Sequence, residues 1–373
     1  MKVTLSSEIL QKKLSFLNHA VSNKSQLPVL QNLLIETKGN TLVLSSTDLE
    51  IGIETVCIAE IKEEGGITVP VKPFTELINS LPIEEITLET KDTSLTVTSK
   101  KTKSTFQTIA KDEFPKLYEE KGVLVAKIQP ENLNKDIGAV VFSASQDTTK
   151  PALSGLLVKQ EQDGFLFVAT DGYRLSLKRH PVTAITPGGD TAQDVAMIIP
   201  ARIFKEIVAI KEQASEIAMF VSKGSNQVVF EIGDTLLIGR LIEAVYPNYE
   251  KIIPLDFSAR ISFEREELLK AVKICAIFAR DSANIIKLSL HSDKIIVSSQ
   301  AAALGENTVT VEAKLSGEAN EIAFNARYLL DVLQNVSAET LQFEMTGPLN
   351  PGVFKIDQDE SFLHLIMPIR IQG

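Results

Sequence analysis

A repeated Thr-Asp pair is the feature of this sequence that comes nearest to catalytic chemistry. Thr47-Asp48 recurs 123 positions later as Thr170-Asp171, and two carboxylates held close together can work as a general acid and a general base. The third occurrence of the surrounding pattern has Gln300-Ala301 instead, and no His, Cys or Lys recurs beside the pair. We therefore expect the two aspartates to cap turns through their own side chains. A hydrolase that uses Asp48 or Asp171 is the alternative.

No other combination of residues predicts an active site, a metal site or a cofactor. The four histidines show no ligand spacing, and the two cysteines, Cys57 and Cys275, lie far apart in the chain. Neither of the glycine-rich patterns that hold nucleotide phosphates is present. The sequence therefore predicts a protein that binds rather than catalyses, without metal or cofactor.

Basic residues recur at two positions of the same repeating pattern, which suggests phosphate binding. At each position the side chain is expected on the solvent face of a helix, about 200° from the apolar stripe. Lysines on the wet face of a helix are common, so a purely solvating role is the alternative. Recurrence in all three copies favours a loosely held, salt-sensitive contact with phosphates. The two sets are Lys12, Lys135 and Lys270, and Lys72, Arg202 and Arg327.

The elements that must position these residues form a threefold internal repeat. Each copy opens with a short strand and a helix whose apolar residues are spaced i, i+4, i+7. A hairpin, a second helix and further alternating strands follow. The first stripes are Leu10, Leu14, Leu17 and Val21; Leu133, Ile137 and Val140; and Leu268, Val272 and Cys275. The second are Pro70, Phe74, Leu77 and Ile78; Pro200, Phe204, Ile207 and Val208; and Asn325, Leu329, Val332 and Leu333.

Three domains of about 120 residues follow from this repeat. Turn-rich or charged joints at Glu119–Gly122 and Pro247–Pro254 predict domains at 1–122, 123–253 and 254–373. The expected fold class is α+β, with two helices packed on antiparallel strands in each domain.

Composition limits the function further. The chain has 373 residues, 44% of them hydrophobic, and a net charge of −10. A uniformly basic surface that wraps nucleic acid is therefore excluded. No run of about 18 apolar residues and no signal-peptide pattern occurs, so we expect a cytoplasmic protein with no membrane partner.

Six short motifs, in this order and spacing, resemble the bacterial sliding clamp, the beta subunit of DNA polymerase III. They are Met1–Thr4, Leu27–Asn32, Thr47–Glu50, Thr170–Leu175, Tyr246–Tyr249 and Met367–Arg370. The resemblance covers the whole chain. It implies three clamp-type domains that form half of a closed ring, a homodimer that encircles duplex DNA and slides along it. It also implies a processivity factor that tethers the replicative polymerase, the clamp loader and repair proteins.

The helix count agrees with a dimeric ring. Six helices of about 10 Å diameter enclose a hole of only about 9 Å, whereas twelve enclose about 28 Å. Only the wider hole admits a DNA duplex.

The resemblance also implies a hydrophobic cleft between the second and third domains that binds short linear motifs of partner proteins. An adaptable groove of aliphatic and Met side chains suits several peptides. The alternative is that these residues belong to the hydrophobic core, where such residue types are usually found. The matching positions are Leu153, Thr170, Gly172, Tyr173, Arg174, Leu175, Pro247, Ile252, Leu349, Met367, Pro368, Ile369 and Arg370.

Two further sets complete the expectations. The resemblance suggests Lys24 and, more weakly, Gln146 as additional DNA contacts. Closure of the ring is expected between domains one and three of different subunits. The expected interface residues are Lys100, Lys101 and Lys103, with Ile277, Phe278, Glu306 and Glu312. For the three lysines, protection of a sheet edge is the alternative role. Outside nucleic-acid work, a repeat scaffold that binds proteins through its sheets is the alternative function.

Overall fold

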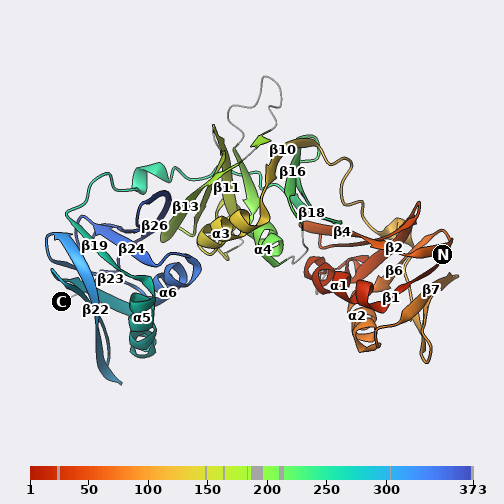
Figure 1. Cartoon of the computed structure of the whole chain (residues 1–373), viewed down its shortest axis with the longest axis horizontal. Helices are drawn as coiled ribbons and strands as arrows, with labels where there is room; N and C mark the ends of the chain where they lie inside the picture. Colours follow the sequence, from red (N-terminus) through yellow and green to blue (C-terminus); the bar gives the residue numbers. More distant parts are fainter. Residues whose placement is uncertain are drawn as a thin grey trace. The chain divides into compact units, whose positions relative to one another are not determined.

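The computed structural model describes residues 1–22, 26–147, 149–162, 164–182, 184–185, 196–209, 214–302 and 304–370. The chain divides into two compact units (Figure 1). Unit 1 comprises Met1–Pro130, Thr183–Thr191 and Arg202–Leu241, and unit 2 comprises Glu131–Val182, Ala192–Ala201 and Ile242–Gly373. The division runs through the second repeat, so the domain boundaries near residues 122 and 253 remain predictions. No helix among the described residues is long and apolar enough to span a membrane.

Unit 1 contains the first repeat and part of the second. Its sheets have the strand orders β5-β1-β7-β8-β9 and β14-β10-β16-β17-β18-β4-β3-β2-β6. From the first repeat come β1 (Lys2–Ser6), α1 (Ser7–Leu17), β2 (Asn32–Lys38), β3 (Thr41–Thr47), β4 (Ile51–Ile58), β5 (Glu60–Glu63), β6 (Gly66–Pro70), α2 (Val71–Ser80), β7 (Glu85–Lys91), β8 (Ser94–Thr98) and β9 (Lys103–Gln107). From the second come β10 (Val123–Ile128), β14 (Ala184–Ile185), α4 (Ala201–Ala209), β16 (Ile217–Ser222), β17 (Gln227–Ile232) and β18 (Thr235–Arg240).

Unit 2 contains the rest of the second repeat and the third. One sheet has the order β15-β11-β12-β13-β26-β25-β24-β19-β22-β21-β20-β23. The second repeat gives α3 (Pro130–Val141), β11 (Gly155–Glu161), β12 (Gly164–Thr170), β13 (Arg174–Pro181) and β15 (Ala196–Pro200). The third gives β19 (Ala259–Glu264), α5 (Arg265–Ala279), β20 (Ile285–Leu290), β21 (Lys294–Ala301), β22 (Gly305–Gly317), β23 (Asn320–Asn325), α6 (Ala326–Asn335), β24 (Thr340–Met345), β25 (Gly352–Ile356) and β26 (Asp359–Ile366).

The three repeats fold as the apolar patterns predict, which confirms the α+β class. Each repeat has two helices, α1 with α2 and α5 with α6 packed side by side (Figure 1), and the pairings between named strands are antiparallel. The stripe residues Leu10, Leu14 and Leu17 are fully buried. Ser6 begins α1 by accepting a hydrogen bond from the backbone N–H of Glu8.

Two details of the predicted helices are wrong. Val21 lies beyond α1, which ends at Leu17 and continues only as a short 3₁₀ turn, so Val21 is extended and not part of the helical stripe. Val208 is 42% exposed, because the last turn of α4 turns it away from the core that buries Ile207.

Two strand pairings join consecutive repeats, and we call them seams. In the first seam β4 of repeat one pairs with β18 of repeat two, with Ile51 opposite Gly239 and Thr55 opposite Thr235. In the second seam β13 of repeat two pairs with β26 of repeat three, with Arg174 opposite Ile366. Ile51 and Arg174 are 123 positions apart, so the seams are equivalent in register.

Candidate partner cleft, DNA-facing cations and subunit edge

The Thr-Asp pairs are turn residues, as predicted. In unit 2 the Asp171 carboxylate accepts the backbone N–H groups of Tyr173 (2.9 Å) and Arg174 (3.1 Å). The Thr170 hydroxyl donates to the Arg174 carbonyl (2.6 Å) and accepts from the Gly172 N–H. Asp48 caps the equivalent turn of unit 1 in the same way. These bonds occupy the side chains in local structure.

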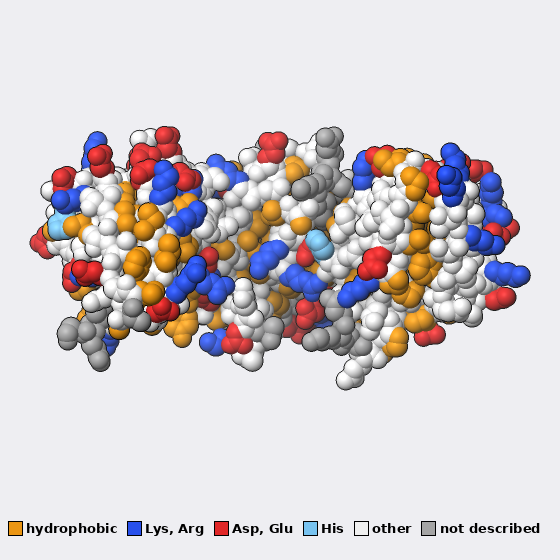
Figure 2. All heavy atoms as spheres, turned by 90° about the horizontal axis from the view of Figure 1, so that it is seen from below, with side chains coloured by type: hydrophobic (Ala, Val, Ile, Leu, Met, Phe, Trp, Pro, Cys, Tyr) orange, Lys and Arg blue, Asp and Glu red, His pale blue; other side chains and the backbone are white. Residues whose placement is uncertain are grey.

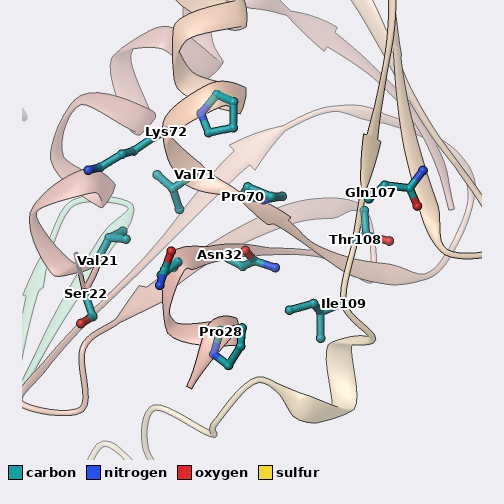
Figure 3. A pocket seen from close by; sticks show the side chains of 12 residues that line it. Val21, Ser22, Pro28, Asn32, Pro70, Val71, Lys72, Gln107, Thr108 and Ile109 are labelled. Atoms are coloured by element: carbon teal, nitrogen blue, oxygen red, sulfur yellow. The ribbon is translucent and has the colours of Figure 1, made fainter. Parts of the chain in front are cut away.

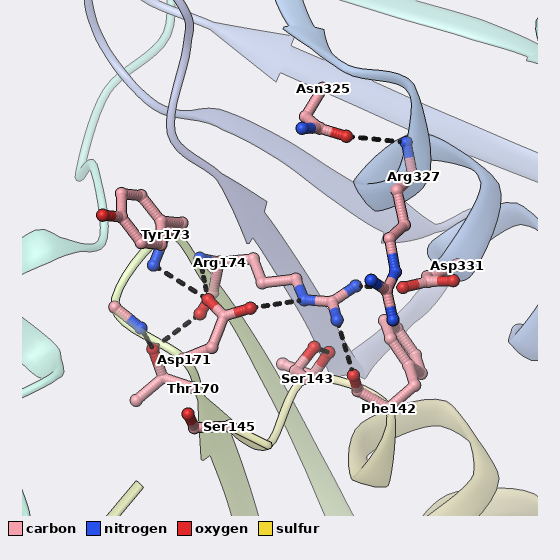
Figure 4. A network of polar contacts seen from close by, with 12 residues as sticks. Phe142, Ser143, Ser145, Thr170, Asp171, Tyr173, Arg174, Asn325, Arg327 and Asp331 are labelled. Carbon is pink, nitrogen blue, oxygen red and sulfur yellow. Dashed lines mark hydrogen bonds and ion pairs between the residues drawn. The ribbon is translucent and has the colours of Figure 1, made fainter. Parts of the chain in front are cut away.

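The Arg174 side chain is buried among partners from its own repeat and the next. Its side chain is 6% exposed, and its guanidinium donates to Asp171 (3.1 Å), to Asp331 of α6 (2.5 Å) and to the Phe142 carbonyl (2.8 Å) (Figure 4). The guanidinium also lies 5.5 Å from the ring centre of Phe142 and 4.7 Å from that of Tyr328. Arg174 is thus held by three protein oxygens and exposes little of its side chain, and its place among the cleft residues remains a prediction.

Two predicted cleft residues, Tyr173 and Met367, lie side by side at the surface of unit 2. Tyr173 is 62% exposed, and its carbonyl accepts the N–H of Met367, which is 39% exposed. Beneath them Leu175 is fully buried in a cluster with Tyr249, Val353 and Leu365. Leu175 therefore forms the floor of this region.

The remaining predicted cleft residues vary in exposure. Ile252 and Leu349 are 44% and 61% exposed, and both belong to segments that flank the Leu175 cluster. Pro247, Gly172 and Arg370 are exposed, Leu153, Pro368 and Ile369 are half-buried, and Thr170 is buried.

Sequence reasoning missed a polar face on β13. The face consists of every second residue of the strand, namely Arg174, Ser176, Lys178 and His180, and all four are buried. Ser176 shares hydrogen bonds of 2.7 Å with Ser143 and with His364 of β26. The available signal was alternation of polar residues within a strand, which ordinarily indicates a wet face.

The other half of this polar face is an ion-pair network. Lys178 donates to Asp359 (2.9 Å) and lies 3.6 Å from Asp136 of α3, whose other oxygen is 2.7 Å from His180 Nδ1. Hydrogen bonds from Ser361 and Lys178 outweigh the upward effect of burial, so the pKa of Asp359 is lowered. Among the described residues, no three His, Cys, Asp or Glu side chains are grouped to hold a metal ion.

The predicted DNA-facing cations differ in whether a nearby carboxylate pairs with them. Lys72, Lys135 and Arg327 are exposed. Lys12 pairs with Glu8 (2.8 Å) one helical turn away. Lys270 pairs with Glu267 (2.9 Å), whose hydrogen bond and charge raise the pKa of the lysine. On the face shown in Figure 2, basic side chains are interspersed with acidic ones.

Arg202 keeps 40% of its side chain exposed but has partners that its helical position did not predict. Its guanidinium donates to the Asp48 carboxylate and to the His19 carbonyl, so it fastens α4 to the first repeat within unit 1. Gln146 is exposed beside Asp147, whose pKa is lowered by hydrogen bonds from Thr149. Lys24 lies outside the described residues.

The predicted subunit interface falls on two sheet edges. β9 is the last strand of its five-stranded sheet and begins at Lys103. Lys100 and Lys101 lie in the turn before it, because the chain reverses between Ser99 and Thr102. In unit 2, among the residues that the structure describes, residues 305–312 of β22 pair with β21 alone, while β19 pairs with residues 313–317.

The groups around these edges are exposed. Glu306 and Glu312 lie on the edge half of β22, and Ile277 is 57% exposed on α5, with Phe278 half-buried. In unit 1 a groove of about 400 Å³ lies where α2 begins, lined by Asn32, Pro70, Lys72, Thr108 and Ile109 among others (Figure 3).

Comparison with known proteins identifies the family. Residues 1–118, 127–248 and 250–370 match the N-terminal, central and C-terminal domains of the DNA polymerase III beta subunit. The chain is 31% identical to the beta sliding clamp of Synechococcus elongatus, over 100% of both chains. It is 26% identical to that of Staphylococcus aureus, over 99% of each.

Solved structures agree with this match. The Bacillus subtilis DNA polymerase sliding clamp superposes with a TM-score of 0.93 at 25% identity, over 100% of both chains. The Pseudomonas aeruginosa sliding clamp bound to griselimycin gives 0.92 at 25% identity, again over 100% of both chains. The chain therefore belongs to the beta subunit family of DNA polymerase III and is a DNA sliding clamp, a replication protein rather than an enzyme.

Proposed function

We propose that two copies of this chain close into a ring around duplex DNA by repeating the seam that joins its own domains. The observation that carries this proposal is the pair of unsatisfied strand edges. β18 and β26 are the last strands of their repeats, and each pairs with the strand after the Thr-Asp turn of the preceding repeat. β9 is the corresponding last strand of repeat one, and β22 the corresponding strand of repeat three. Pairing β22 of one copy with β9 of another satisfies both edges.

The register of this closing seam follows from the other two. Gly52 opposes Ile238, and Leu175 opposes Leu365. The equivalent residues are Glu306 in β22 and Thr105 in β9, so they should face each other across the interface. In that register Lys103 opposes Thr308 and stands diagonal to Glu306, within reach of its carboxylate.

The closing seam lacks an ion pair that the first seam has. There the turn carboxylate Asp48 binds Arg202 at the start of α4. The equivalent residues are Ala301, which has no charge, and Lys72, which lines the groove at the start of α2 (Figure 3). We propose that the turn between β21 and β22 of the partner subunit docks at this groove. Without the turn carboxylate this junction is the weakest of the ring, and it is the one that opens to admit DNA.

Charge reversal tests the closing seam. Lys103→Glu should shift the protein from dimer to monomer in light-scattering chromatography, because it places two carboxylates diagonal to each other. Glu306→Lys should do the same, and the double variant should restore the dimer. Glu318→Lys, on an exposed residue beyond β22, is the matched control and should remain dimeric.

The second part of the proposal concerns the partner cleft around Tyr173 and Met367. We propose that the exposed apolar side chains of Tyr173, Ile252, Leu349 and Met367 form an adaptable groove above Leu175. It would take short apolar motifs of the replicative polymerase, the clamp loader and repair proteins. Griselimycin, bound by the Pseudomonas aeruginosa clamp, would compete for the same groove.

Methionine labelling provides a direct test of the cleft. The chain has five methionines, and Met1, Met197, Met219 and Met345 are buried whereas Met367 is exposed. With ¹³C-methyl methionine, griselimycin or the polymerase should shift the Met367 signal most. A shift confined to other methionines would place the ligand elsewhere.

DNA contact is the third part. Exposed Lys72, Lys135 and Arg327 would interact with the phosphates without sequence preference, and the weakness of an interspersed surface would allow sliding. Such work places the protein in the bacterial cytoplasm.

Retention on DNA tests encirclement. Labelled protein is loaded on a nicked circle and gel-filtered in high salt before and after the circle is cut. Retention on the circle and loss from the linear form would show topological binding. Equal loss from both would contradict the ring and favour a protein-binding scaffold.

A further inference from the structure

We infer that Asp331 of α6 is a positioning residue for the partner cleft, acting through Arg174 without touching the bound partner. The inference rests on the proposed cleft and deepens it. It assigns control of the cleft's shape to an ion pair between the second and third repeats.

The chain of contacts runs from α6 to the cleft surface. Asp331 holds one nitrogen of Arg174 (2.5 Å), and Arg174 holds Asp171 through its Nε (3.1 Å). Asp171 in turn accepts the N–H of Tyr173, and the Tyr173 carbonyl accepts the N–H of Met367 (2.9 Å). Each link is a single hydrogen bond or ion pair, so a change at Asp331 reaches both exposed cleft residues.

The guanidinium has no alternative arrangement that leaves the cleft intact. All three of its nitrogens donate to protein oxygens, and two aromatic rings flank it. Because the side chain is 6% exposed, an Arg174 released by Asp331 would be a buried charge with an unmet donor. We expect it to move toward solvent and to disturb the adjoining turn that carries Gly172 and Tyr173, both of which are exposed.

The equivalent turn of unit 1, which Asp48 caps, has no counterpart of the Arg174–Asp331 ion pair. The equivalent of Arg174 is Ile51, and the equivalent of Asp331 is Glu206, which bonds His19 Nδ1 at 2.6 Å. Asp48 still caps its turn, but its free oxygen is held by Arg202 from the next repeat. In the first seam the carboxylate of the second helix reaches the turn only by a longer path, through His19 and Arg202 to Asp48. The Asp331–Arg174–Asp171 relay is specific to the seam that carries the cleft.

Paired substitutions in the full-length dimer test the inference. Asp331→Asn keeps the size and one acceptor of the side chain but removes its charge, and should weaken griselimycin binding about tenfold. Asp331→Glu restores the charge and should bind within about threefold of the native protein. Asp359→Asn is the matched control, because it removes the partner of Lys178 in the same seam but has no link to the turn. Its affinity should be unchanged.

A second readout separates positioning from a general loss of stability. In the free protein, the ¹³C-methyl signal of Met367 should move in Asp331→Asn and not in Asp359→Asn, while that of buried Met345 stays in place. Unchanged Met367 signal and unchanged affinity in Asp331→Asn would overturn the inference, as would equal losses in Asp359→Asn. If the native protein binds neither griselimycin nor the polymerase at Met367, the proposed cleft fails. The Met367 signal of the free variants then still decides whether Asp331 positions that residue.

Discussion

The two seams have the same backbone register but opposite interiors. Along the inward face of β4 lie Ile51, Ile53, Thr55 and Cys57, and the equivalent positions of β13 are Arg174, Ser176, Lys178 and His180. Both sets are buried. The β4 face is mainly apolar and includes the Thr55–Thr235 hydrogen bond (2.9 Å), whereas the β13 face makes ion pairs and hydrogen bonds.

This difference shows that strand pairing fixes the geometry of a seam, whereas the buried side chains decide how rigid the seam is and which neighbouring groups it can position. An apolar seam needs only complementary volume and tolerates small shifts. A buried polar network requires each member to be satisfied, and loss of one member is costly. The polar seam lies directly under the proposed partner cleft, where a fixed turn is needed.

Replacing Arg174 by Ile, the residue of the first seam, should have the largest effect. Asp171 and Asp331 would lose their common partner in a largely buried site, and we expect the unfolding free energy to fall by about 3 kcal/mol. Denaturant unfolding monitored by circular dichroism measures it. Ile51→Val, the matched change in the apolar seam, should cost only about 1 kcal/mol.

A second substitution sharpens this result. Adding Asp331→Leu to Arg174→Ile should recover part of the lost unfolding free energy, because it removes one of the two carboxylates left without their arginine partner. Native-like stability of Arg174→Ile alone would mean that the polar network contributes nothing to the second seam.

Acidification should loosen the second seam more than the first. Burial, and secondarily the charge of Arg174, hold the pKa of His364 well below its usual value of 6.5. The unfolded chain therefore binds a proton below about pH 6.5 that the folded chain does not. Stability should be complete above that pH and fall below it, by at most about 1.4 kcal/mol per pH unit.

Hydrogen exchange at pH 7.5 and 5.5, corrected for intrinsic rates, measures this effect in each seam separately. Protection of β13 and β26 should decrease more than that of β4 and β18, where the equivalent of His364 is Leu237. His364→Leu should remove the difference. An equal decrease in His364→Leu would assign the acid sensitivity to other groups.

The smallest expected effect is loss of the Thr55–Thr235 hydrogen bond in the first seam. Thr235→Val removes the hydroxyl that donates to Thr55, and the remaining hydroxyl keeps a bond to the Asp234 carbonyl (3.3 Å). We expect a cost of about 1 kcal/mol in denaturant unfolding. A loss as large as that of Arg174→Ile would mean that the two seams depend equally on polar contacts.

Much of this architecture was predictable because each repeat has the same apolar periodicity. Leu10, Leu133 and Leu268 begin three equivalent stripes, and all three are buried. Clamp family membership and the turn role of Asp48 and Asp171 were predicted and confirmed. These properties depend on local pattern, which a single sequence contains.

The failures concern side chains whose partners come from another repeat. Arg202 was expected in solvent because its own helix places it opposite the core, but Asp48 of the preceding repeat captures it. Arg174 was assigned to the cleft by resemblance alone, and its ion pair with Asp331, 157 residues away, was not foreseen. Helical periodicity gives the face of a residue and cannot give its distant ion-pair partner. The assignment of the cleft, the DNA contacts and the subunit edge remains a prediction.

Engineered cross-linking tests most directly the central claim that the ring closes by a third copy of the same seam. In Thr105→Cys/Glu306→Cys the two thiols should lie opposite each other, at a Cα separation of about 5.5 Å that a disulfide spans. Mild oxidation should give a covalent dimer on a non-reducing gel. Thr105→Cys/Thr308→Cys, two residues out of register and about 7–8 Å apart, should stay largely monomeric. Equal cross-linking of both pairs, or of neither, would contradict the account.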